Sequence, residues 1–202
     1  MNLREMEKLT AHFDAYFGQT DSLVLHPAAM EPHIDTLLYE PTDALPYWKL
    51  VTMGASDYRM PQKPAPLSDR NEYIMLVEPS VNLHDAATVN PYLKILLEVA
   101  LYPQLNQCLV SYGHSLEWEP EDGEEMVGAF LEFPQIIPDS NVLRCKLGLM
   151  KTVTCLLVVP LTRPEIDHLL EIGPEAFSEW LFPDDETAPR HFLSELHRTE
   201  RF

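Results

Sequence analysis

Apolar residues recur at every third or fourth position in four segments of the chain, which is the spacing that gathers them on one face of a helix. The first segment ends at Gly18. The second opens with Asn90, a favoured N-cap residue, and Pro91, which is common at the first helical position. The third opens with a Thr-x-x-Glu capping box, and a Gly-Pro pair separates it from the fourth. The pattern therefore predicts helices over residues 3–18, 90–101, 162–172 and 175–182.

Six shorter segments are rich in apolar and β-branched residues and are bounded by residues that favour turns, as strands are. One of them carries no charge along its whole length, which indicates a central strand buried on both faces. The predicted strands are 33–39, 47–53, 72–77, 108–112, 127–133 and 153–159, the last being the uncharged one. The stretch from Gly54 to Arg70 is rich in proline and is expected to form a long loop.

The order of these elements defines the predicted fold. Strands occur before and after a central helix, and neither an internal repeat nor a linker divides the chain. We therefore predict an α+β fold, a single-domain α/β sandwich with a mixed, largely antiparallel sheet and packed helices. Residues 1–30 should form an N-terminal helix and lead-in, residues 31–182 the main domain, and residues 183–202 a polar, partly mobile tail.

The charge balance limits what this domain could bind. The 202 residues include 32 acidic and 14 basic side chains, for a net charge of -18. Neither nucleic acid nor an anionic membrane is an expected partner, because both require Lys and Arg. No glycine-rich loop could cradle a phosphate, and no cofactor is expected. Three cysteines without a Cys-x-x-Cys pair, together with a charged N-terminal segment, predict a soluble cytoplasmic protein with reduced thiols.

The acidic excess is concentrated in one segment. Between Lys94 and Arg144 there is no Lys or Arg, and six carboxylates fall close together: Glu117, Glu119, Glu121, Asp122, Glu124 and Glu125. A solvated loop is the simpler interpretation, and a docking surface for a basic partner is the functional one. A calcium loop is disfavoured, because the order of the carboxylates is not that of an EF-hand and Pro120 interrupts it.

Two pairs of residues could carry chemistry. His33 and Asp35 share one face of a predicted strand, so the pair could orient a base or bind a metal. The sequence shows no third residue that could join this pair. A structural pairing is therefore the simpler interpretation, and no metal site is predicted. Ser56 and Asp57 follow Gly54 at a strand end, where turn hydrogen bonds are the simpler role. An enzyme site assembled in the tertiary structure around His33, Asp35, Ser56 and Asp57 is the alternative to a binding function.

The segment from Tyr47 to Pro61 resembles the signature of the suppressor of fused family. Its Leu-x-Thr-x-Gly-x-Ser-x-x-x-Met pattern is matched at Leu50, Thr52, Gly54, Ser56 and Met60. Arg70 with Glu72-Tyr73 is similar to the Arg-x-Glu-Leu segment of that family, with Tyr73 in place of the usual Leu. The late strand, Val153 to Leu161, and the residues Glu165, Gly173 and Pro174 also match. The resemblance spans roughly residues 31–182.

This resemblance implies a non-catalytic binding protein with an α/β sandwich domain. The eukaryotic members hold transcription factors of the Hedgehog pathway by clamping a peptide between two domains. This chain is long enough for only one such domain, so it resembles the compact bacterial members, which are grouped with immunity proteins of polymorphic toxin systems. The expected partner is then a protein, such as a basic nuclease-type toxin domain, and the chain is expected to be a monomer or weak homodimer.

Two segments supply the candidate partner-binding residues, the family motif with its flanks and the acidic segment. These residues are His33, Asp35, Gly54, Ser56, Asp57, Arg59, Met60, Arg70, Glu117, Glu119, Glu121, Asp122, Glu124 and Glu125.

Overall fold

The computed structural model describes residues 1–18, 23–26, 32–61, 67–184 and 190–198. Its helices are α1 (Leu3–Phe17), α2 (Ala86–Asn106), α3 (Arg163–Ile172) and α4 (Pro174–Leu181), with short 3-10 turns η1 (Ala55–Asp57) and η2 (Ser140–Leu143). Its strands are β1 (Leu23–Leu25), β2 (Asp35–Tyr39), β3 (Trp48–Met53), β4 (Asn71–Val77), β5 (Ser115–Glu117), β6 (Gly128–Glu132), β7 (Arg144–Lys146) and β8 (Thr152–Leu161).

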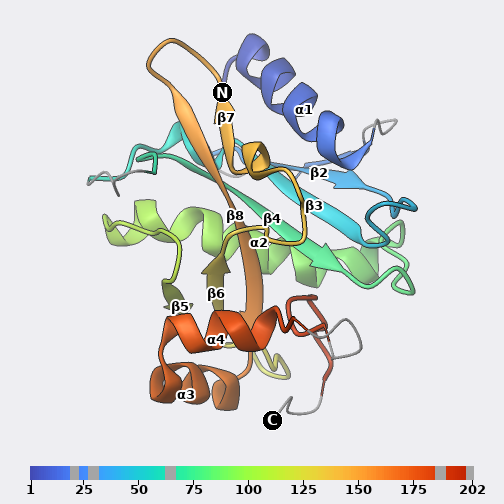
Figure 1. Cartoon of the computed structure of the whole chain (residues 1–202), viewed down its shortest axis with the longest axis vertical. Helices are drawn as coiled ribbons and strands as arrows, with labels where there is room; N and C mark the ends of the chain where they lie inside the picture. The colour runs from blue at the N-terminus through green and yellow to red at the C-terminus, as the bar shows by residue number, and fades with distance from the viewer. Residues whose placement is uncertain (19–22, 27–31, 62–66, 185–189, 199–202) are drawn as a thin grey trace.

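The strands form one sheet in the order β1-β2-β3-β4-β8-β6-β5, and β7 pairs with the start of β8. Neighbours are antiparallel except β4 and β8, which are parallel. Strand β8 runs through the middle of the molecule from one end to the other (Figure 1). It is buried along almost its whole length, as its uncharged sequence predicts. The predicted mixed, largely antiparallel α+β fold is confirmed.

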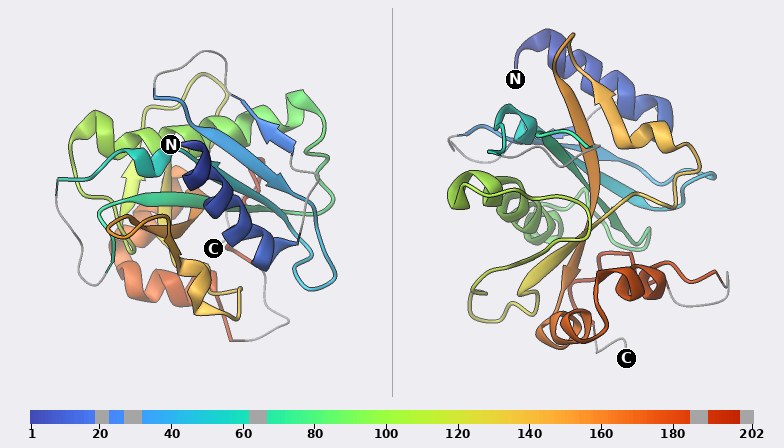
Figure 2. Two further views of the ribbon diagram at one scale, coloured as in Figure 1. Left: turned by 90° about the horizontal axis from the view of Figure 1, so that it is seen from above. Right: turned by 60° about the vertical axis from the view of Figure 1, so that its left-hand side comes forward.

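Helices cover both faces of this sheet, which produces two hydrophobic clusters. Alternate residues along each strand point to opposite faces. On one face the strands pack under α1, α3 and α4, through residues such as Phe13, Ile166 and Phe177. On the other face they pack against α2, through residues such as Leu96 and Val99. The two views in Figure 2 show α2 on one side of the sheet and α1 on the other. No helix among the described residues is both long enough and apolar enough to cross a membrane.

Helix α2 differs from its prediction. It begins at Ala86, and the side chain of Asp85 is the N-cap, accepting a hydrogen bond from the Thr88 N–H at 2.9 Å. Asn90 is therefore not the cap, and Pro91 lies inside the helix. The helix can begin before Asn90 because the Asp85 side chain satisfies a first-turn N–H group, which has no partner within the helix.

The predicted strand over 108–112 is wrong. In that segment the backbone of Val110 bonds to side chains, donating to the Met60 sulfur at 3.3 Å and accepting from the Asn71 amide at 2.8 Å. With those groups already satisfied, the segment does not join a ladder, and the strand begins instead at Ser115.

The end of the chain is packed against the domain where the structure describes it. Phe192, Leu193 and Leu196 are buried, and the Ser194 N–H donates to the Leu76 carbonyl at 2.8 Å. Residues 190–198 are therefore not a free polar tail. The remaining tail residues, 185–189 and 199–202, lie outside the described residues.

Candidate functional site

The family motif surrounds a buried carboxylate. Glu72 on β4 is completely buried and accepts hydrogen bonds from the Thr52 hydroxyl at 2.6 Å and from the N–H groups of Gly54 and Ser56 at 3.0 Å each. Burial raises the pKa of Glu72 above its ordinary value, and these hydrogen bonds oppose the rise. The Arg70 guanidinium closes the turn by donating to the Ser56 carbonyl at 2.7 Å and the Asp57 carbonyl at 2.9 Å.

Two further motif residues also serve the fold. Gly54 has φ of 126°, and a Cβ there would lie 2.7 Å from the His33 carbonyl oxygen. Only glycine fits such a backbone at this distance. Met60 is buried, and its sulfur accepts from the Val110 N–H. Most of the motif thus shapes the turn after β3, and this leaves Asp57 and Arg59 as its exposed polar side chains. Arg59 is 72% exposed and pairs with Asp69 at 2.7 Å.

The enzyme alternative requires two pairs of residues to meet. Ser56 is completely buried. The Asp57 carboxylate pairs with Lys151 at 3.0 Å and with the amino group of Met1. His33 instead bonds to Asp35, and within the described residues no hydrogen bond joins either of these two to Ser56 or Asp57. The four side chains do not assemble into one catalytic group.

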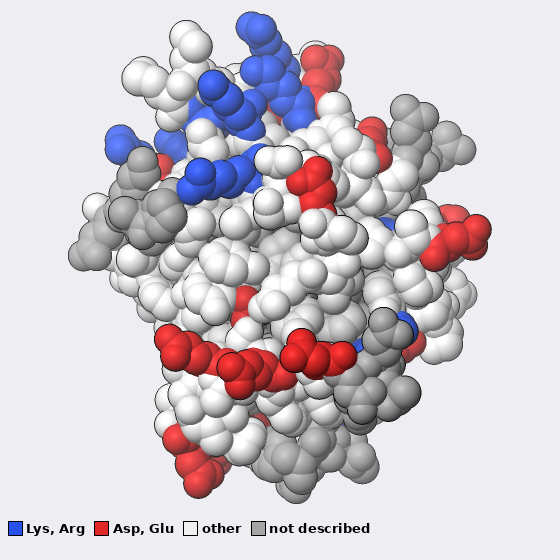
Figure 3. Space-filling view, viewed as in Figure 1, with Lys and Arg blue, Asp and Glu red and all other residues white. Residues whose placement is uncertain are grey.

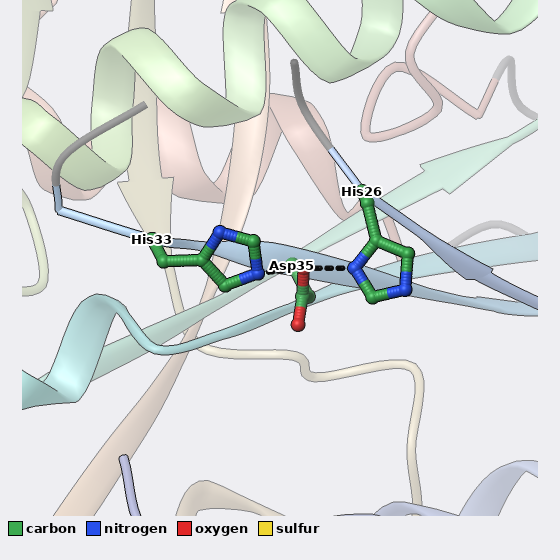
Figure 4. Close-up of side chains that lie close together, drawn as sticks. All are labelled: His26, His33 and Asp35. Atoms are coloured by element: carbon green, nitrogen blue, oxygen red, sulfur yellow. Dashed lines mark hydrogen bonds and ion pairs between the residues drawn. The ribbon is translucent and has the colours of Figure 1, made fainter. Parts of the chain in front are cut away.

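His33 and Asp35 meet a third residue that the sequence reasoning did not identify. His26, just after β1, bonds through Nδ1 to Asp35 Oδ1 at 2.7 Å, and His33 Nε2 lies 2.8 Å from the same oxygen. Figure 4 shows the two imidazoles on either side of the carboxylate. Both histidines are more than half exposed, whereas Asp35 is buried.

The six acidic residues of the segment 117–125 divide into two groups. Glu117 pairs with Arg163 at 2.6 Å, and Lys94 pairs with Glu121 at 2.9 Å and Glu124 at 2.7 Å. The other three, Glu119, Asp122 and Glu125, are exposed and form no ion pair within the part of the chain that the structure describes. Their negative charge is therefore free to act on a partner.

This segment borders a groove of about 250 Å³ between α2 and the packed C-terminal segment. The apolar residues of the lining are Pro91, Ile95, Trp118, Met126 and Leu196, and the acidic ones are Glu98, Asp122, Glu124 and Glu125. Lys94 and His197 also line the groove, and Lys94 is paired with Glu121 and Glu124. Trp118 is held in place because its indole N–H donates to the Met126 carbonyl at 3.2 Å. An apolar lining with acidic residues beside it suits a partner that offers both an apolar and a basic side chain. We call this feature the acidic groove.

Charge is separated along the molecule as well. On the face shown in Figure 3, Lys and Arg gather at the end that carries α1 and the β7–β8 loop, while Asp and Glu form a row over the half that carries α3 and α4 and are also scattered over the rest of the face. The basic end includes Arg4, Lys8 and Lys146, which line one shallow hollow. The charge of -18 is thus unevenly distributed on this face, where basic side chains gather at one end.

Comparison with known proteins places this fold in a family. The family model for suppressor of fused protein matches residues 30–191. A search of curated proteins finds no match. Among solved structures, a protein of Neisseria gonorrhoeae FA 1090 described as a suppressor of fused homologue has a TM-score of 0.67 at 11% identity. That alignment covers 98% of this chain and 97% of the other.

Two further structures share the fold. The Sufu–Fu complex gives a TM-score of 0.64 at 12% identity and covers 97% of this chain and 91% of the other. Drosophila Suppressor of Fused gives 0.63 at 11% identity, with 98% of this chain matched to 51% of that one, so this chain spans about half of that protein. Because the family model covers most of the sequence and the motif residues form one structural unit, this chain belongs to the suppressor of fused family.

Proposed function

We propose that this protein is a non-catalytic binding module that holds a basic protein partner in its acidic groove, and that it acts as an immunity protein against a nuclease-type toxin. The observation that carries the proposal is the groove itself, where unpaired carboxylates stand beside a partly buried tryptophan. One similar structure is a complex between Sufu and Fu, which supports protein binding as the general role.

The toxin class follows from charge complementarity. A nuclease binds an anionic substrate, so its active site is basic, and an acidic protein can occupy that site in place of the nucleic acid. Long-range attraction between the two surfaces speeds their encounter, and the buried contacts in the groove slow their separation. The carboxylates and the tryptophan should therefore affect different rate constants.

The first test removes the three unpaired charges of the acidic segment 117–125. The triple variant Glu119→Gln/Asp122→Asn/Glu125→Gln should lower the association rate constant with a toxin domain encoded beside this protein by roughly tenfold, and should weaken its salt dependence. Surface plasmon resonance at low and high salt measures both effects.

The matched control removes the same charge elsewhere. The control uses three exposed glutamates that do not line the groove: Glu171 near the end of α3, and Glu175 and Glu179 on α4. Glu171→Gln/Glu175→Gln/Glu179→Gln should leave the association rate within about twofold, because distant charges are screened at physiological salt. An equal loss in both triple variants would mean that net charge, and not the groove, attracts the partner.

A second test concerns the tryptophan. Trp118→Ala should raise Kd by about 30-fold, mainly through faster dissociation, because a partly buried aromatic anchor contributes about 2 kcal/mol at an interface centre. The protective effect in cells that produce the toxin should fall in parallel. If the wild-type protein protects against none of the toxins encoded near it, the immunity role is wrong, whereas binding of another basic protein in the groove would keep the binding role.

The exposed residues of the motif loop offer a further prediction. Arg59→Ala should alter partner affinity if the motif loop contacts the partner, while changing the free energy of unfolding by less than about 1 kcal/mol, because its pairing with Asp69 is exposed. Asp57→Asn should behave in the same way. Circular dichroism during thermal unfolding provides the stability measurement, and a large loss of fold in either variant would assign these residues to structure alone.

A further inference from the structure

The side chains of His26, His33 and Asp35 converge because of the strand register. In the β1–β2 pairing, Leu25 lies opposite Thr36, so the next position along places His26 opposite Asp35. His33 precedes Asp35 by two residues, a spacing that puts both side chains on one face of an extended chain. Directly opposed and alternate residues are neighbours on a sheet surface. Two independent features of backbone geometry thus bring three donor groups together.

We propose that this cluster is a binding site for a divalent transition-metal ion, with Zn²⁺ as the expected occupant. The three donor atoms all lie within 4.8 Å of one another, and no other group of three or more His, Cys, Asp or Glu side chains in the described part of the chain converges in this way. Two imidazoles and one carboxylate form a donor set that zinc and its neighbours in the periodic table prefer, whereas Mg²⁺ and Ca²⁺ prefer oxygen alone.

The distances require only a small adjustment. Metal–ligand bonds of 2.0–2.2 Å in tetrahedral zinc place neighbouring donor atoms about 3.4 Å apart. The two His–Asp separations of 2.7 and 2.8 Å would widen slightly to admit the ion. His26 and His33 are 64% and 54% exposed, so their rings can turn without disturbing the core. Asp35 is 3% exposed and provides the fixed point of the site.

Exposure of the two rings leaves room for a fourth ligand. Three protein ligands are characteristic of a zinc site that keeps one position open for water or for a group from another molecule. The ion would also tie His26 to β2. Strand β1 is short and, among the described strands, lies at the edge of the sheet, where it pairs with β2, so an added link there would hold the edge in place. This inference is independent of the acidic groove.

The test uses the untagged full chain, because a histidine tag would itself bind metal. Titration calorimetry with Zn²⁺ alone should show one ion bound per chain. His26→Gln and His33→Gln should each weaken that binding by at least about tenfold, as loss of a group that supports a metal typically does. The matched control is His84→Gln. His84 is equally exposed and bonds to Glu40 at 3.0 Å, but that pair has no third donor, so this variant should bind zinc like the wild type.

A structural readout accompanies the titration. Zinc should slow amide hydrogen exchange in β1 and β2 of the wild type and of His84→Gln, and should have no such effect in His26→Gln/His33→Gln. Absence of zinc binding by the wild type would overturn the proposal and leave a hydrogen-bonded trio. An equal loss of affinity in His84→Gln would overturn it as well, by showing scattered surface binding.

Discussion

Replacing Glu72 by alanine should destabilise the protein by about 3 kcal/mol or more, which is a large part of the 5–15 kcal/mol that typically separates folded and unfolded domains. The change removes the acceptor for the Thr52 hydroxyl and for the N–H groups of Gly54 and Ser56, all of which are buried. Each buried donor that is left without a partner costs about 1–3 kcal/mol. Urea denaturation monitored by circular dichroism measures the loss.

Glu72→Gln separates the hydrogen bonds from the charge. Burial raises the pKa of Glu72 in the folded protein above 4.5, so the folded state binds a proton more tightly than the unfolded state. The wild type should therefore lose stability from this group as the pH rises from about 4.5 through the folded-state pKa. Glutamine keeps an acceptor for the two N–H groups and does not titrate. The Glu72→Gln variant should therefore become more stable relative to the wild type as the pH rises. A difference that does not vary with pH would contradict the raised pKa.

Arg198→Ala should destabilise the protein by about 3–5 kcal/mol, because it leaves a buried carboxylate without its counter-charge. The Arg198 side chain is 3% exposed and that of Glu165 is fully buried, and the guanidinium bonds to both carboxylate oxygens, with Nε 3.0 Å from Oε1. It also donates to the Pro160 carbonyl at 2.8 Å. One side chain thus joins the C-terminal segment to β8 and α3.

The double variant Arg198→Met/Glu165→Gln is the control for this prediction. It removes both charges and keeps approximate side-chain volume, so it should recover a large part of the stability lost in Arg198→Ala. Glu165 also accepts from the Thr162 N–H at the start of α3, at 2.9 Å, and glutamine can continue to do so. If the double variant is as unstable as Arg198→Ala, the loss comes from packing and not from an unpaired charge. Because Leu196 lines the acidic groove, Arg198→Ala should weaken partner binding as well.

Local patterns predicted the parts of this fold that depend on neighbouring residues in the chain. The uncharged run of β8 and the Thr162–Glu165 start of α3 are examples, because burial on both faces and capping are both visible in a short stretch of sequence. The predicted start of α2 at Asn90 is wrong because the segment contains two residues that favour the N-cap position, Asp85 and Asn90, and sequence spacing does not decide between them.

The parts that failed depend on contacts between distant residues. The sequence assigns Glu72 to a strand without indicating its burial, and only its position beside the turn after β3 makes it a buried acceptor. His26 reads as an isolated histidine until the β1–β2 register is known. A usable signal did exist in the tail, where Phe192, Leu193 and Leu196 have helix-like apolar spacing inside an otherwise polar stretch.

The position of β8 in the chain has a consequence for how this protein folds. Its parallel pairing with β4 joins residues as far apart in sequence as Asn71 and Thr154, and β6 also pairs with it. Contacts between such distant residues require costly loop closure and slow the folding of a domain. During synthesis, the edge of β4 that pairs with β8 remains without its partner strand until β8 has left the ribosome. We expect refolding to be slow and prone to aggregation at high protein concentration, with the docking of β8 as the step that commits the chain to its native sheet.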